Sequence, residues 1–266
     1  MSWDSKVIWS EGLFLQPHHF QQADRHSEAQ RAGLAARTRP YLWGFSELEI
    51  DKEGLKFGKF GVSACAGLSR DGALFRVPQA EEHPPSLEVD EATRDTIVYL
   101  TIPARRQGAT EVDVTAASDQ SASRYKASEL EVTDTMGKDR RPATVGVGTL
   151  RLKFALESDD TTDLLKIPVA RIIEVRADKE VILDQGFIPS CIDIRASTTL
   201  SGHLREVEGL LSHRMTALAG RLSEGGTARG AAEISDFLLL KTVNRCLPLV
   251  RHMLSVENTH PETLYR

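Results

Sequence analysis

Trp9 to Asp24 reads W-S-E-G-L-F-L-Q-P-H-H-F-Q-Q-A-D, and the fold of the chain is best approached from this stretch. Extended-type apolar residues precede Pro17, so the sequence predicts a strand that ends in a sharp break. Gly12 permits unusual backbone angles, and Pro17 biases Gln16 away from the helical region. Because proline is tolerated at the first helical position, we expect a helix to begin near Pro17.

The same stretch resembles the N-terminal signature of the TssK family, W-x-E-G-x-F-L-x-P-x-H-F-Q-x-x-D. TssK is the baseplate subunit of the bacterial type VI secretion system. Leu13 stands where the family pattern has methionine, a conservative departure. A second region, from Phe237 to Met253 and on to Tyr265, is similar too, so the resemblance covers both ends of the chain in the same order. The matching signature positions are Trp9, Glu11, Gly12, Phe14, Leu15, Pro17, His19, Phe20, Gln21 and Asp24.

The composition is that of an ordinary globular chain. The 266 residues are 41% hydrophobic, which is enough for one large or two modest domains with a real core. A net charge of -5 offers no general attraction to nucleic acid or anionic lipid, so partners should be recognised by shape. Cys65, Cys191 and Cys246 are odd in number and far apart, which favours a reduced, cytoplasmic compartment over a disulfide framework or a zinc site. No apolar run reaches the length of about 18 residues that direct membrane insertion requires.

The first 192 residues are predicted to form an N-terminal helix and an antiparallel β-sandwich of Greek-key or jelly-roll character. The helix is expected over Pro17 to Thr38, ending before Pro40. Asp51-Lys52-Glu53-Gly54, with apolar residues on both sides, predicts a hairpin turn. Leu150, Leu152, Phe154 and Leu156 alternate with Arg151 and Lys153, which predicts one half-buried strand with the basic residues pointing away. Strands are predicted around Val112 and Val114 and at residues 60–65, 74–77, 97–102, 125–132, 145–156, 167–175 and 180–183.

From near Ile194 the spacing of apolar residues becomes helical, and residues 193–266 are assigned to a helical neck. Two helices are predicted, joined by a flexible turn at residues 223–230, and Pro248 is expected to kink the second. Two helices alone cannot bury both of their apolar seams, so we interpret the seams as neck trimerisation contacts. Ordinary packing within the chain is the alternative. The seams consist of Leu200, Leu204, Val207, Leu211, Leu218, Phe237, Leu240, Val243, Leu247, Val250 and Leu254.

The resemblance to the TssK family implies more than the residues show by themselves. It implies a shell domain similar to the shoulder of phage receptor-binding proteins, then a helical neck and a C-terminal head, assembled as a homotrimer. The shell would bind the TssF and TssG wedge, and the head would contact the TssL and TssM membrane complex. This chain would then stop at Arg266, inside the neck, and lack the head. The implied function is a structural adaptor of the baseplate at the cytoplasmic face of the inner membrane.

No catalytic pattern is found, so no enzyme activity, catalytic residue or cofactor is expected. G-x-S-x-G, P-loop and H-E-x-x-H motifs do not occur, and Gly146-Val147-Gly148 lacks the third glycine of a dinucleotide fingerprint. His19 and His26 lie two turns apart on one helical face without a carboxylate at ligand spacing, so we favour surface or packing roles over a metal site.

Two further alternatives stay open. The signature aromatics either fill the core or form a binding hot spot. The alternative function is a phage-like receptor- or carbohydrate-binding module, although the loops between the predicted strands are poor in aromatic residues. Arg105 and Arg106 are interpreted as solvated loop charges.

Overall fold

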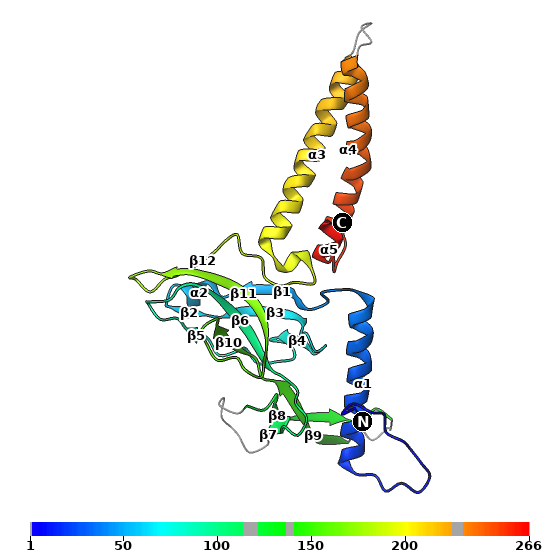
Figure 1. The fold of residues 1–266 in the computed structure, drawn as a ribbon, viewed down its shortest axis with the longest axis vertical. Helices are drawn as coiled ribbons and strands as arrows, with labels where there is room; N and C mark the ends of the chain where they lie inside the picture. The colour runs from blue at the N-terminus through cyan, green and yellow to red at the C-terminus, as the bar shows by residue number, and fades with distance from the viewer. Residues whose placement is uncertain (1, 114–121, 137–140, 225–230, 266) are drawn as a thin grey trace.

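The structure is a computed structural model that describes residues 2–113, 122–136, 141–224 and 231–265. A β-rich body forms the middle of the molecule, and a helical hairpin projects from one end of it (Figure 1). The long helix α1 (Pro17–Thr38) stands beside the strands, and the N-terminus lies at the end away from the hairpin (Figure 1).

The described strands form four sheets, with orders β1-β3-β4, β10-β6-β11-β12, β2-β5 and β7-β8-β9. All pairings are antiparallel except the short parallel pair β7 with β8. The strands are β1 (Gly44–Ile50), β2 (Lys59–Phe60), β3 (Val62–Leu68), β4 (Leu74–Val77), β5 (Leu87–Glu88), β6 (Arg94–Pro103), β7 (Val112–Asp113), β8 (Tyr125–Thr133), β9 (Pro142–Leu150), β10 (Lys153–Leu156), β11 (Leu164–Val175) and β12 (Val181–Leu183).

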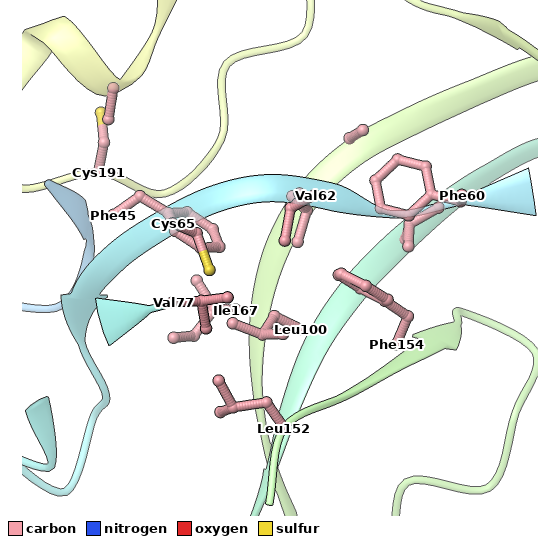
Figure 2. Close-up of a cluster of buried hydrophobic side chains, with 14 of the residues drawn as sticks. Phe45, Phe60, Val62, Cys65, Val77, Leu100, Leu152, Phe154, Ile167 and Cys191 are labelled. Carbon is pink, nitrogen blue, oxygen red and sulfur yellow. The ribbon is translucent and has the colours of Figure 1, made fainter. Parts of the chain in front are cut away.

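One hydrophobic cluster joins the β1-β3-β4 sheet to the β10-β6-β11-β12 sheet. Figure 2 shows Val62 and Cys65 of β3 pointing toward Leu100 of β6 and Phe154 of β10. The rings of Phe60 and Phe154 meet edge to face, with centroids 5.2 Å apart. Such ring pairs add to the stabilisation from burial alone, and they fix how the sheets sit on each other.

The predicted helix from Pro17 to Thr38 is confirmed with the same bounds, but the strand predicted before it is wrong. Residues 5–10 form no strand and fold back along α1 instead. Gln22 Nε2 donates to the carbonyl oxygens of Trp3 (3.0 Å) and Ser5 (2.7 Å), and His26 Nδ1 donates to the Asp4 carbonyl at 2.9 Å. Side chains of α1 therefore bind the backbone at the start of this segment, and no described strand pairs with it.

The hairpin predicted at Asp51 to Gly54 is also wrong. The Asp51 carboxylate accepts the Glu53 N–H at 3.0 Å and so caps a short helix, α2 (Lys52–Leu55). Asp favours this local capping bond, which here prevails over a two-residue hairpin turn. β1 consequently pairs with β3.

The single strand predicted at residues 145–156 is two strands, because the chain changes sheets at Arg151. β9 pairs with β8, whereas β10 pairs with β6. Arg151 is buried at the crossing, and its N–H donates to the Arg124 carbonyl at 2.9 Å. The prediction that Arg151 points away from the core is therefore wrong.

The projecting hairpin consists of α3 (Thr198–Glu224) and α4 (Ala231–Ser255), followed by the short helix α5 (Pro261–Tyr265), which the sequence did not predict. α4 runs continuously through Pro248. Ion pairs join the two helices, Arg251 to Glu208 at 2.8 Å and Arg221 to Asp236 at 3.0 Å.

A buried carboxylate ties the helical hairpin to the body. Asp193, 1% exposed, precedes the single turn η1 (Ile194–Ala196). Its oxygens accept the Arg195 N–H (2.9 Å) and the Asn258 N–H (3.0 Å), and the Arg195 guanidinium pairs with it at 2.7 Å. The Ile194 N–H also donates to the Thr259 carbonyl at 2.9 Å, so the chain segments before α3 and after α4 are joined directly.

Candidate protein-binding surfaces

The aromatic and aliphatic residues of the signature lie at the surface. Phe14 is 81% exposed, and Ile8, Trp9, Leu15 and Phe20 are each more than half exposed, whereas Leu13 is half-buried. Single exposed apolar residues need no explanation, but several that lie close together in the sequence form a candidate contact for another molecule. We call this group the N-terminal apolar surface; it consists of Ile8, Trp9, Phe14, Leu15 and Phe20.

Contacts with residues at the start of α1 fix the conformation of this surface. The Trp9 ring lies 6.3 Å from the His19 ring and 6.4 Å from the Phe20 ring, centroid to centroid. His19 Nδ1 accepts the Gln16 N–H at 3.1 Å, so this imidazole satisfies a backbone donor at the helix start. Gly12 has a φ of +79°, a conformation that glycine adopts without strain.

The remaining signature side chains, Glu11, Pro17, Gln21 and Asp24, are exposed as well. Pro17 occupies the first position of α1, as predicted. Within the part of the chain that the structure describes, no group of three His, Cys, Asp or Glu residues could hold a metal ion.

The predicted neck seams divide into two groups. Leu200, Leu204, Leu218 and Leu247 are buried in the single chain, and Leu200 and Leu204 belong to the main hydrophobic cluster. Leu211, Leu240, Val243, Val250 and Leu254 are half-buried, whereas Val207 and Phe237 are exposed. Packing within the chain, the alternative interpretation, therefore accounts for the four buried leucines.

A further apolar stripe on the neck was missed from the sequence. Ile234, Leu238 and Leu249 are spaced by four and eleven residues, which places them on one face of α4, away from the seam. The spacing was visible in the sequence, but the more regular seam beside it hid the second pattern. We use the name neck outer stripe for the exposed large apolar side chains of α3 and α4, which are Val207, Leu210, Ile234, Phe237, Leu238, Leu239 and Leu249.

A cavity of about 280 Å³ lies between α1 and the strands, lined in part by Arg31, Arg105 and Arg124. Two of these arginines pair with acids inside the chain: Arg105 with Glu28 of α1, and Arg124 with Asp71 at 2.8 Å. Arg105 also donates to the Tyr125 hydroxyl at 2.9 Å. Arg105 thus links α1 to the body of the protein, and the prediction that it is a solvated loop charge is wrong.

Exposed apolar residues near the start of α1 and along α3 and α4 are typical of one class of protein, a subunit of a larger assembly. Residues 19–266 match the family model described as bacterial type VI secretion, VC_A0110, EvfL, ImpJ, VasE. The chain belongs to this family.

Individual relatives agree with the family. The chain is 39% identical over its whole length to the type VI secretion system baseplate component TssK1 of Pseudomonas aeruginosa, and it spans 60% of that protein. A crystal structure of TssK matches 98% of this chain and 59% of the TssK chain, with 33% identity and a TM-score of 0.89. In a cryo-electron microscopy structure of a TssK-TssF-TssG baseplate subcomplex, a chain with 24% identity shares the fold at a TM-score of 0.80, over 98% of this chain and 84% of that one.

Helices long and apolar enough to cross a bilayer are not found among the residues that the structure describes.

Proposed function

We propose that this chain is the shell and neck of a type VI secretion baseplate adaptor, which binds a wedge of the TssF and TssG type. The observation that carries the proposal is the 39% identity to TssK1 over the whole chain. Residues 1–192 would be the shell, and its β-sandwich would consist of the β1-β3-β4 sheet and the β10-β6-β11-β12 sheet. Residues 193–266 would be the neck. The adaptor needs no cofactor and no catalytic residue.

The N-terminal apolar surface is the wedge contact in this proposal. It combines Trp and Phe side chains, the residue types that most often dominate binding energy, with the exposure that contact requires. Their exposure in the single chain favours the hot-spot interpretation of the signature over the core interpretation. The exposed Glu11, Gln21 and Asp24 would form the polar rim of the contact.

The neck is the trimerisation element in this proposal. The buried seam leucines hold α3 against α4, and the neck outer stripe then packs against other copies around a threefold axis, forming the helical bundle. Val207 and Phe237 are the two predicted contact residues that lie on this stripe.

The relative TssK1 is longer than this chain, and the last part of the proposal concerns that additional length. A head beyond the neck would contact a membrane complex of the TssL and TssM type and so hold the baseplate at the cytoplasmic face of the inner membrane.

Capture by the wedge tests the proposed function. A tagged TssF–TssG pair from the same bacterium should retain residues 1–266 through size-exclusion chromatography in a complex with several copies of the chain. A folded chain that elutes separately from the wedge would contradict the adaptor role.

A further inference from the structure

β9 is an edge strand with unusual properties. Among the described strands it pairs with β8 alone, and most of its residues are exposed. Its sequence, P-A-T-V-G-V-G-T-L, contains no charged residue. Natural proteins usually protect such an edge with charges, bulges or a covering segment, because its free backbone groups can pair with another chain. β9 has a proline at its first position, and Gly148 and Leu150 near its end line a cavity together with Glu28 and Arg31 of α1. No described strand pairs with this edge.

The hydrogen-bond pattern identifies the free backbone groups. The Arg151 N–H donates to the Arg124 carbonyl at 2.9 Å, and the next pair in the register is Tyr125 with Leu150. Hydrogen-bonded pairs alternate in an antiparallel ladder, so every second residue of β9 directs its N–H and C=O away from β8. These outward residues include Thr144, Gly146 and Gly148.

The three outward residues between Pro142 and Leu150 are small, which suits close approach by another backbone. A Cβ atom added at Gly146 would meet nothing within 4 Å. Glycine inside a strand weakens it unless the position serves a purpose, and close approach of a second chain is one such purpose.

The two faces of the β8–β9 hairpin differ in chemistry. Leu130 and Val132 of β8 share one face with Val145 of β9, and all three are at least 38% exposed. Glu129 and Glu131 lie on the opposite face, together with Gly146. A strand that pairs with β9 should therefore be apolar on one face and basic on the other.

Residues 6–10, K-V-I-W-S, match this pattern in part: one face would carry Val7 and Trp9, and the other would carry the basic Lys6 together with Ile8 and Ser10. Val7 and Trp9 would extend the apolar face, and Lys6 would lie on the face of Glu129 and Glu131. Ile8 would then pack over the space at Gly146. The segment is rich in strand-forming residues, forms no strand, and has no backbone hydrogen bond from Lys6 through Trp9 to the described residues.

We propose that residues 6–10 of a neighbouring copy add to the free edge of β9. The inference rests on the proposed trimer, in which copies run parallel to one axis. Strand pairing would cover Ile8 and Trp9, so Phe14, Leu15 and Phe20 of the N-terminal apolar surface would remain for the wedge. Residues 6–10 and β9 both lie at the end of the molecule away from the neck (Figure 1). In neighbouring copies of the trimer they would therefore lie at the same level along the threefold axis. Pairing of β9 with a second β9 would be twofold, whereas a closed threefold ring requires two different surfaces at each contact.

Disulfide trapping tests the pairing. Ile8→Cys and Gly146→Cys, combined in a Cys246→Ser background, place two thiols on neighbouring strands, where Cα atoms are close enough for a disulfide. Oxidation of the intact chain should give linked dimers and trimers on a non-reducing gel. The matched control, Ile8→Cys with Val145→Cys, puts the second thiol on the opposite face of the same strand and should link at least about tenfold less efficiently.

Light scattering on the same samples separates this proposal from the trimer on which it rests. A trimeric mass without links between copies would overturn the strand pairing alone, and a monomeric mass would overturn both proposals. Links formed within one chain would also overturn the exchange between copies.

A backbone variant gives an independent readout. Gly146→Pro removes an outward N–H and leaves the bonds to β8 intact, whereas Gly146→Ala keeps that N–H. Gly146→Pro should lower the yield of trimer on dilution at least about tenfold relative to Gly146→Ala, with both chains folded. Equal trimer yields would contradict the pairing.

Discussion

At the scale of single residues, Phe14 tests the N-terminal apolar surface. Its ring is 81% exposed, so a change there removes no core packing. Phe14→Ser should weaken binding to the TssF–TssG pair by about 2 kcal/mol, or about thirtyfold, at an unchanged melting temperature. Titration calorimetry measures the first quantity, and thermal unfolding the second.

Phe60 is the matched control because its ring is fully buried against Phe154. Phe60→Ser should lower the free energy of unfolding by at least about 3 kcal/mol. If Phe14→Ser lowered thermal stability to a similar extent, Phe14 would belong to the core of the protein and not to a contact surface.

The cysteines respond to pH in a predictable order. Burial raises the pKa of the Cys65 thiol to about 12 and that of the Cys191 thiol to about 11, from 9.0 in both cases. At about pH 8 a thiol-specific reagent should therefore modify Cys246 first, and the other two only after unfolding. Immediate modification of Cys65 or Cys191 in the folded chain would show that the core is open at those positions.

The same pKa shifts predict an alkaline limit of stability. The folded chain holds these two protons more tightly than the unfolded chain, so this contribution is complete below pH 9 and declines from there toward the folded pKa values. Urea unfolding between about pH 8 and 11 should show the decline, and Cys65→Ala together with Cys191→Ala should reduce it.

At the scale of elements, we expect the buried and the exposed apolar side chains of the neck helices to have different roles. Leu238 lies on the neck outer stripe and is 56% exposed, whereas Leu204 is 2% exposed. Leu238→Glu should convert a trimer to a monomer with little change in the melting temperature of the body. Leu204→Asp should unfold the base of the neck, at a cost of at least about 3 kcal/mol, because it places a charge in the core.

Light scattering and thermal unfolding of the two variants separate these effects. A trimer that survives Leu238→Glu would remove the outer stripe from the contact. Leu204→Asp is a test of the fold and not of assembly, since its side chain already packs within one chain.

The junction between neck and body depends on Asp193. Asp193→Ala removes the acceptor of two backbone N–H groups, and we expect a loss of about 2 kcal/mol in the free energy of unfolding. Arg195→Ala should cost about 0.5 kcal/mol, because the guanidinium is half-exposed. Equal losses in the two variants, measured by urea unfolding, would show that the ion pair, and not the backbone bonds, holds the junction.

The sequence predicted those elements whose signals are long and local. The helix from Pro17 to Thr38 has a proline start and a proline after its end, and two regular seams mark the neck helices. Short signals failed where a local bond competed with them: Asp51 capped a helix instead of a hairpin. The change of sheet at Arg151 depends on partners distant in sequence, so alternation alone could not show it.

At the scale of the whole molecule, the site was predicted only in part. The resemblance drew attention to Trp9, Phe14 and Phe20, but periodicity could not decide between core and surface for them. Exposure follows from the fold of the whole chain, which places α1 beside the sheets and leaves the N-terminal apolar surface uncovered. The open edge of β9 likewise appears only once the sheet order is known.

The central claim is that the apolar surfaces left by one chain are contacts between subunits. The mass of the isolated chain, measured by light scattering during size-exclusion chromatography, tests this most directly. We predict three times the chain mass of 29.4 kDa across a range of concentrations. A stable, folded species of 29.4 kDa would contradict the claim, because the neck outer stripe would then remain in water.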